Sequence, residues 1–249
     1  MSKNIEIRLV LIILLLPMIQ FAQNKEISLQ VFGGSAFPLG DFGNKISYPT
    51  EITRRSGFDF GSSTGLATTG YAAGIELTLP VLTDGLGWQT SAKFILSPTD
   101  KNTIEEEFSR DPKVNGTLTF ETGNWINIPL FTGFSYGIKL SDQFNLFCHI
   151  QAGINITKQA YRKAVYTGTV VENTEYNSMT DFGLETGLSI EFNDHYVISV
   201  RYLDLGRPRY EGQRYLNEKL FTEIPLRNFT IEAEEKPVTI LLLTLGFKL

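Results

Sequence analysis

The chain has 249 residues, of which 42% are hydrophobic, 12% aromatic and 20% charged. Its formal net charge of -5 gives no electrostatic basis for binding nucleic acid. A disordered chain is excluded because 18 Phe and 10 Tyr bring too much apolar surface. After residue 22 the sequence has no run of about 18 apolar residues that would form a transmembrane helix. With a neutral mean hydropathy of -0.04, these figures favour a single folded β-rich domain.

The first 22 residues have the pattern of a secretory signal peptide. Lys3 and Arg8 flank the start of an apolar stretch at 9–16, and Ala22 offers a small residue for cleavage. An uncleaved anchor helix is the alternative, but the stretch is shorter than the roughly 20 residues that a membrane span needs. We therefore expect residues 1–22 to be removed and residues 23–249 to form the exported domain.

Eight segments of the mature chain alternate between apolar and polar residues with a period of two. In the segment 144–157 every even position is apolar, and most odd positions are polar or glycine. Because successive side chains of a strand point to opposite faces, this pattern predicts strands with one apolar face. The last segment is less regular, since Ile240 and Leu242 fall on its other face. The predicted strands span 27–37, 70–82, 88–96, 126–138, 144–157, 182–192, 196–202 and 238–249.

The connections between these strands alternate in length. Those at 83–87, 139–143 and 193–195 are tight turns, and the other four, near 38–69, 97–124, 159–179 and 206–236, are long. Strands of about 9–13 residues suit a tilted membrane crossing, and an even number closes without an open edge. We predict an all-β fold, an eight-stranded antiparallel transmembrane β-barrel with short periplasmic turns and long extracellular loops. It would lie in the cell outer membrane with both termini in the periplasm.

A soluble lipocalin-like barrel is the main alternative, because its strands also alternate. Its outer face would carry many charges, whereas the polar phase here is mainly Gly, Ser, Thr, Asn and Gln. That composition suits the narrow interior of an eight-stranded barrel, so we expect the apolar phase to face lipid. Aromatic residues near both ends of this phase predict two interfacial girdles. The girdle near the short turns comprises Trp88, Tyr136, Phe144, Phe192, Tyr196 and Phe247, and the one near the long connections comprises Phe37, Tyr71, Phe182 and Tyr202.

Ionisable residues on the inward phase are expected to form a charge network in the lumen. Charges inside an apolar envelope must be paired or hydrated. We predict that Arg201 and Lys93 pair with Glu76 or Glu185 near mid-height and plug the lumen, and a gated pore is the alternative. The six residues are Glu76, Lys93, His149, Glu185, Glu191 and Arg201.

The remaining candidates for chemistry favour a protein without enzymatic activity. Outer-membrane enzymes that act on lipid need a His beside a Ser and a carboxylate at an accessible level. His195 is expected in a periplasmic turn and His149 in the mid-lumen, so we predict no catalytic, cofactor-binding or metal site. The single Cys148 cannot form an internal disulfide and is expected on the lipid face.

Two of the long connections are rich in charge. An acidic cluster, Glu105–Glu107 with Asp100 and Asp111, fits no cation-loop spacing and is expected to be a solvated loop. The last long connection mixes Arg with Glu, and within it 219–224 has the pattern of a short strand above the membrane. Contact with a divalent cation or a glycolipid is the functional alternative for the acidic cluster. Binding of anionic lipid headgroups or of a partner is the alternative for the last connection.

Several short stretches resemble a known family. They are the leader ending at Gln23, the stretch Ala36–Asp41 with Phe42, the strand Trp125–Leu130 and the stretch Gln151–Asn155. Together they resemble the outer-membrane β-barrel domain proteins of Bacteroidota, including the PorT-like group. The transmembrane domains of OmpA and OmpX are more distant architectural relatives. The resemblance covers essentially the whole mature chain.

The barrel and its resemblance lead to one expected function and two alternatives. We expect a non-enzymatic outer-membrane protein that is structural or binds surface partners through its extracellular loops. Its surroundings would be outer-membrane lipid and lipopolysaccharide. The resemblance also implies a PorT-like accessory protein of a protein secretion system, with secretion proteins as partners. A small diffusion channel is the third reading.

Overall fold

The computed structural model describes residues 27–43, 65–81, 85–103, 105, 118–216 and 227–249. The predicted signal peptide at 1–22 therefore lies outside the described residues. The same holds for the predicted short strand at 219–224 and for Glu106, Glu107 and Asp111 of the acidic cluster.

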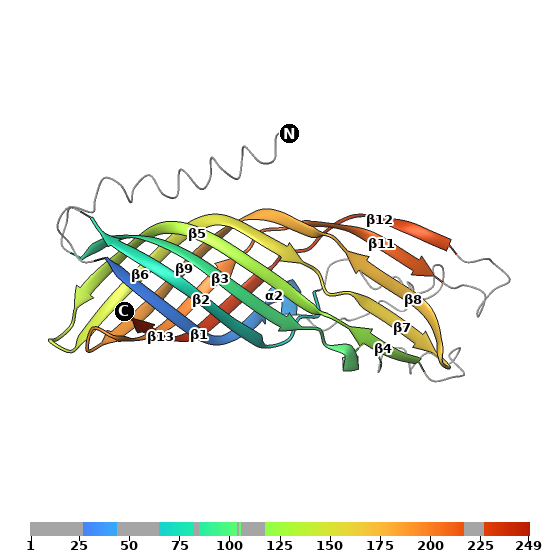
Figure 1. Cartoon of the computed structure of the whole chain (residues 1–249), viewed down its shortest axis with the longest axis horizontal. Helices are drawn as coiled ribbons and strands as arrows, with labels where there is room; N and C mark the ends of the chain where they lie inside the picture. The colour runs from blue at the N-terminus through green and yellow to red at the C-terminus, as the bar shows by residue number, and fades with distance from the viewer. Residues whose placement is uncertain (1–26, 44–64, 82–84, 104, 106–117, 217–226) are drawn as a thin grey trace, which may run out of the picture.

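Eight antiparallel strands close into a barrel, which confirms the predicted all-β fold. Going round the barrel, the order is β1-β13-β10-β9-β6-β5-β3-β2, and pairing of β1 with both β13 and β2 closes the wall (Figure 1). The strands are β1 (Ser28–Leu39), β2 (Gly70–Pro80), β3 (Leu86–Pro98), β5 (Asn124–Lys139), β6 (Phe144–Lys158), β9 (Ser178–Phe192), β10 (Tyr196–Asp204) and β13 (Thr239–Lys248).

The short connections all lie at one end of the barrel. Phe192 pairs with Tyr196 across the turn between β9 and β10. Within that turn Asn193 (φ 50°) and Asp194 (φ 60°) adopt the left-handed backbone that Asn and Asp tolerate better than most residues. The beginning of β1 and the end of β13 lie at the same end, since Gln30 pairs with Lys248.

The long connections are largely strands rather than simple loops. Five strands within these connections form an antiparallel sheet in the order β12-β11-β8-β7-β4. We call it the extracellular sheet, after the side of the membrane on which the sequence predicts the long connections. Short links join each of these strands to a barrel strand, so the wall continues beyond one end of the barrel (Figure 1). The connections 159–179 and 206–236 therefore differ from the expected loops. The strands are β4 (Leu118–Thr122), β7 (Arg162–Tyr166), β8 (Thr169–Tyr176), β11 (Arg209–Leu216) and β12 (Arg227–Glu235).

A single helical turn, α2 (Gly40–Gly43), follows β1 and inserts Phe42 into the barrel mouth, where it is buried. The turn is allowed by Gly40, whose φ of 54° lies in the left-handed region that favours glycine. Among the residues that the structure describes, no helix has the length and hydrophobicity needed to cross a membrane.

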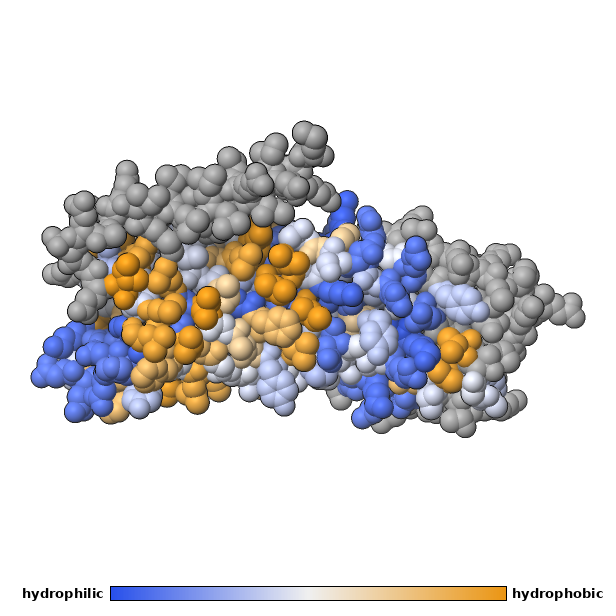
Figure 2. All heavy atoms as spheres, in the orientation of Figure 1, coloured by the Kyte–Doolittle hydropathy of each residue, from blue (hydrophilic) through white to orange (hydrophobic). Residues whose placement is uncertain are grey.

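The outer wall of the barrel is apolar on the strands where exposure alternates most regularly. On β10 every second residue is exposed, and from Tyr196 to Tyr202 these residues are all apolar or aromatic, namely Tyr196, Ile198, Val200 and Tyr202, before Asp204 ends the strand. Figure 2 shows apolar residues gathered over the barrel, with hydrophilic residues over the extracellular sheet and at the short-turn end. Other exposed apolar side chains of the wall include Ile75, Phe94, Phe134, Ile150, Leu184, Leu188, Ile190, Leu243 and Leu245.

Candidate functional site

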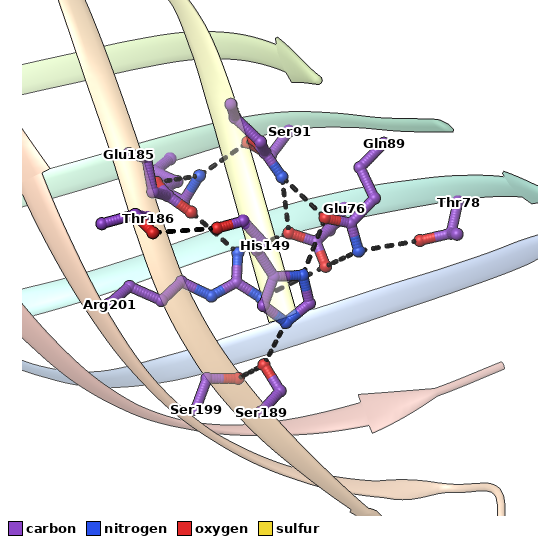
Figure 3. A network of polar contacts seen from close by, with 12 residues as sticks. Glu76, Thr78, Gln89, Ser91, His149, Glu185, Thr186, Ser189, Ser199 and Arg201 are labelled. Carbon is purple, nitrogen blue, oxygen red and sulfur yellow. Dashed lines mark hydrogen bonds and ion pairs between the residues drawn. The ribbon is translucent and has the colours of Figure 1, made fainter. Parts of the chain in front are cut away.

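A buried ion-pair cluster crosses the lumen and is centred on Arg201 of β10. Its guanidinium contacts Glu76 of β2 through both terminal nitrogens, and Nη2 lies 3.2 Å from Glu76 Oε1. Nη1 also lies 3.0 Å from Glu185 Oε1 on β9. All three side chains are no more than 2% exposed. Arg201 therefore links the second strand of the chain to the penultimate strand of the barrel (Figure 3).

Lys93 of β3 completes the charge balance of this cluster. Its Nζ lies 2.8 Å from Glu185 Oε2 and donates to Ser91 Oγ at 2.6 Å. Two carboxylates thus face one guanidinium and one ammonium, so the cluster is neutral overall. The pairing of buried charges avoids the large penalty of an isolated ion in an apolar envelope.

Neutral polar side chains extend the cluster to neighbouring strands. The two ring nitrogens of His149 on β6 lie 2.9 Å from Gln89 Oε1 and 2.6 Å from Ser189 Oγ. Gln151 donates to Gln89 Oε1 at 2.9 Å and accepts from Ser91 Oγ at 2.7 Å. Figure 3 shows His149 directed into the same space as Arg201. We call this connected group the polar tier of the lumen.

The structure brings five of the six predicted lumen residues together and leaves one apart. Glu191 lies nearer the short-turn end, where it accepts from Lys248 Nζ at 2.9 Å and from Asn145 Nδ2 at 3.1 Å. Gln89, Ser91 and Gln151 are not among the residues that the sequence pattern singles out. Their position on the inward phase of β3 and β6 was the available signal.

The lumen between the polar tier and the extracellular sheet is mainly apolar, whereas the sequence pattern predicts a mainly polar interior. Asn127 and Asn155 are also buried here, and Asn155 Nδ2 donates to Asn127 Oδ1 at 3.1 Å. Phe131 lies over Lys93, with Nζ 5.6 Å from the ring centroid, and marks the boundary between the two regions. Ile240 and Leu242, the irregular residues of the last strand, are fully buried here. We call this region the apolar tier, and its buried residues include Ala36, Phe42, Ile95, Trp125, Phe131, Leu203, Leu205, Tyr210, Val238, Ile240 and Leu242.

Three aromatic side chains packed edge to face close the apolar tier below the extracellular sheet. The ring of Trp125 packs edge-on against Phe42 at 5.2 Å and against Tyr210 at 5.4 Å. Trp125 Nε1 donates to the carbonyl of Gly65 at 2.8 Å, and Tyr210 Oη lies 2.9 Å from Thr157 Oγ1. Burial raises the pKa of the Tyr210 phenol, because desolvation penalises the phenolate. The lumen is therefore filled by side chains at two successive levels.

The predicted aromatic girdles lie on the outward phase of the barrel strands. Eight of the ten are exposed, and Phe37 and Trp88 are half-buried. Phe144, Phe192, Tyr196 and Phe247 occupy directly paired positions on four neighbouring strands, which makes a continuous row at the short-turn end.

The separation of the two girdles matches a bilayer. On β9, Phe182 and Phe192 are ten residue steps apart. At about 3.4 Å per residue and a tilt of about 40°, that separation is roughly 26 Å along the barrel axis, close to the apolar band of about 25 Å in outer-membrane barrels.

The extracellular sheet has a charged outer face. Arg209 pairs with Glu235 at 2.6 Å and Lys163 with Glu121 at 3.0 Å, both near the surface. Of the predicted acidic cluster, Asp100 accepts from the backbone and side chain of Thr103, at 3.1 and 2.8 Å. Glu105 Oε1 accepts from the backbone of Phe120 at 2.9 Å. Among the residues that the structure describes, no three His, Cys, Asp or Glu are grouped so as to hold a metal ion.

No family model matches the sequence, and no curated protein matches it. Solved structures with a similar fold include Ail, the attachment invasion locus protein of Yersinia pestis, with 11% identity over 91% of this chain and 100% of that chain and a TM-score of 0.42. The outer membrane protein OprG of Pseudomonas aeruginosa is 10% identical over 91% and 97% of the two chains, with a TM-score of 0.44. The N-terminal β-barrel domain of OprF from the same organism is 8% identical over 89% and 97%, with a TM-score of 0.39. These likenesses are too distant to assign a function.

Proposed function

We propose that the protein is a non-enzymatic outer-membrane barrel that displays an ordered β-sheet on the cell surface. The main support for the membrane location is the apolar outer face of the barrel between the two aromatic girdles. The outward residues of β9 between Phe182 and Phe192 are Leu184, Thr186, Leu188 and Ile190, without a charge among them. A soluble barrel with this wall would expose a continuous apolar surface to water, which monomeric soluble proteins avoid.

The extracellular sheet supports a binding role. Five strands of ordered sheet present a rigid charged surface, and a rigid surface loses less conformational entropy on binding than flexible loops do. A surface partner engages this sheet, while the girdles contact outer-membrane lipid and lipopolysaccharide.

The filled lumen argues against the diffusion-channel reading. The polar tier pairs its charges and the apolar tier is filled by buried side chains, whereas a conducting barrel needs a hydrated path. The secretion-accessory reading stays a prediction from the family resemblance. Recovery of the protein with secretion components from native outer membrane would favour it over a surface binder.

The location and orientation are tested by labelling single cysteines. Cys148 is first replaced by Ser, because it is the one native cysteine. Thr167→Cys is then placed in the exposed turn between β7 and β8, and Ser141→Cys in the exposed turn between β5 and β6. A membrane-impermeant maleimide added to intact cells is expected to label the Thr167 variant only.

Other labelling results with the same two variants would reject the proposed orientation. Labelling of the Ser141 variant alone in intact cells would place the short turns outside. Labelling of neither variant until the cells are broken would reject surface display. Absence of both proteins from the heat-modifiable outer-membrane fraction would reject the membrane location itself.

A further inference from the structure

A pocket of about 280 Å³ lies at the extracellular rim of the barrel, where β1 and the chain before β2 no longer pair. We call it the rim pocket, and it is lined by Phe37, Pro38, Gly43, the segment 66–69 and Asp100. Phe37 belongs to the girdle near the long connections, and the other lining residues lie beyond this girdle. Thr69 is exposed, so the pocket opens to the surface. A guest therefore enters it without crossing the hydrocarbon layer, where a charge would be costly.

Backbone hydrogen bonds hold the wall formed by 66–69 in place. Thr68 N–H donates to the carbonyl of Pro98 at the end of β3, at 2.7 Å, and Ala67 N–H donates to the carbonyl of Phe42 in α2, at 3.0 Å. Leu66 has a φ of 51°, in the left-handed region that a bulky side chain rarely adopts. These contacts are made within the chain, so the pocket is formed before a guest arrives and little ordering is needed on binding.

The polar groups of the rim pocket are better suited to accept hydrogen bonds than to donate them. The backbone N–H groups of Ala67, Thr68 and Asp100 already donate to carbonyls of the chain, and Pro38 has no N–H. The hydroxyl of Thr68 donates to the carbonyl of Pro98 at 3.2 Å, which leaves its oxygen lone pairs as acceptors. An ionised carboxylate, as on Asp100, also only accepts. These groups favour a guest that donates hydrogen bonds over an anion.

Asp100 supplies the one ionisable side chain among the described residues that line the pocket. Its two oxygens accept from the backbone N–H and the hydroxyl of Thr103, which fixes the orientation of the carboxylate. A carboxylate has about four lone-pair sites, so these bonds leave room for a further donor at each oxygen. Phe37 and Pro38 add apolar contact area beside this charge. A half-buried carboxylate next to an apolar wall fits a cation carried on a hydrocarbon stem.

We propose that the rim pocket binds the ammonium group and hydrocarbon stem of one lysine of the surface partner. The identity of the guest as part of a partner rests on the proposed function. The pocket volume is close to the lower limit of about 300 Å³ for ligand pockets, which suits a single side chain. A guanidinium binds a carboxylate best through both oxygens at once, whereas an ammonium is a compact charge that one oxygen can hold. Because both oxygens of Asp100 already accept from Thr103, lysine fits better than arginine.

Titration of the full chain in phosphatidylcholine nanodiscs with n-butylammonium chloride tests the proposal by methyl NMR. Leu66 and Ala67 line the pocket and carry methyl groups, and the buried Ala164 of β7 is the reference. At constant ionic strength, butylammonium is expected to shift the Leu66 and Ala67 resonances saturably and to leave Ala164 unchanged. n-Butanol, which has the same stem without the charge, is expected to bind much more weakly. Absence of a saturable shift, or equal binding of butanol, would overturn the proposal.

Two pairs of variants separate the pocket from the general surface. Asp100→Asn keeps an oxygen for Thr103 but removes the charge, and it should weaken butylammonium binding about tenfold. Glu211→Gln removes the same charge from an exposed position of β11 and should leave binding unchanged. Thr69→Phe fills the opening and should abolish binding, whereas Thr180→Phe adds the same ring to an exposed position of β9 without effect. Equal binding within either pair would overturn the proposal, and unchanged heat-modifiable mobility checks that all four variants fold.

A capped tripeptide with one lysine, acetyl-Gly-Lys-Gly-amide, distinguishes a lysine in a polypeptide from a free amine. It is expected to shift the same methyl resonances as butylammonium. Shifts with butylammonium but not with the peptide would restrict the pocket to small amines and overturn the lysine proposal. Labelling of the Thr167 cysteine variant on intact cells tests surface display separately. Peptide binding without that labelling would support the pocket and reject surface display, and labelling without any binding would overturn the pocket alone.

Discussion

Removing the guanidinium of Arg201 should destabilise the barrel more than any other single change in the lumen. Arg201→Met leaves Glu76 with amide contacts from Gln89 at 3.1 Å and Gln151 at 3.4 Å and without its ion-pair partner. Glu185 keeps Lys93 at 2.8 Å. One uncompensated carboxylate then remains at a site that is 2% exposed.

The expected loss follows from measured effects of breaking buried pairs. Removing one partner of a buried ion pair costs about 3–5 kcal/mol, because the other charge stays desolvated. At about 1.4 kcal/mol for each factor of ten, the folding equilibrium should shift by roughly two to four orders of magnitude. Lys93→Met also leaves the cluster with one excess negative charge. It should cost less, because both carboxylates keep a contact with Arg201.

A charge-balanced double variant is the control. Arg201→Met with Glu76→Gln removes one charge of each sign and leaves the Lys93–Glu185 pair neutral. Replacing a buried pair together is often nearly neutral, so the double variant should recover most of the loss. Guanidinium unfolding of the protein in lipid vesicles, followed by heat-modifiable gel mobility, measures both free energies. A loss below about 1 kcal/mol for Arg201→Met would mean that water reaches the cluster, and the filled-lumen argument would be wrong.

Two further predictions concern the outer wall and the lumen. Leu188→Arg places a charge on the lipid face between the girdles and should cost about 2–4 kcal/mol in the same assay, whereas Glu211→Arg on the extracellular sheet should change stability little. A similar small effect for both would contradict the lipid-facing assignment. Purified protein in planar bilayers should give no resolvable channel events, because both tiers fill the lumen, and stable unitary conductance would contradict that.

The barrel strands were predictable because their two faces differ so strongly. Every second residue is apolar from Phe144 to Ile156 in β6 and from Tyr196 to Tyr202 in β10, and the opposite phase holds polar residues such as His149 and Arg201. A strand of this kind can cross a membrane only with its apolar phase facing lipid and its charged phase facing the lumen. The sequence pattern alone therefore predicts which residues face inward. The two carboxylates and two cations of the polar tier could be anticipated for the same reason.

The extracellular sheet was not predictable from the same pattern. β7 (Arg162–Tyr166) and β11 (Arg209–Leu216) mix charged and apolar residues, and neither carries the long regular alternation of a membrane strand. Outside the bilayer, water satisfies exposed polar groups, so selection for an apolar face is weaker. The Gly at position 168 was the local sequence signal of a hairpin, and in the structure Thr167 and Gly168 adopt the positive φ values of 48° and 80° that such a turn requires.

The irregular first half of β13 shows how the extracellular sheet is attached to the barrel. Ile240 and Leu242 break the alternation because the inner wall changes from polar to apolar near the extracellular end. The same buried cluster contains Trp125 of the barrel together with Tyr176 and Tyr210 of the extracellular sheet. The core of the upper barrel is therefore continuous with the base of the sheet. A sheet that shares a core with the barrel cannot move freely relative to it, so the surface that it offers to a partner is fixed before binding.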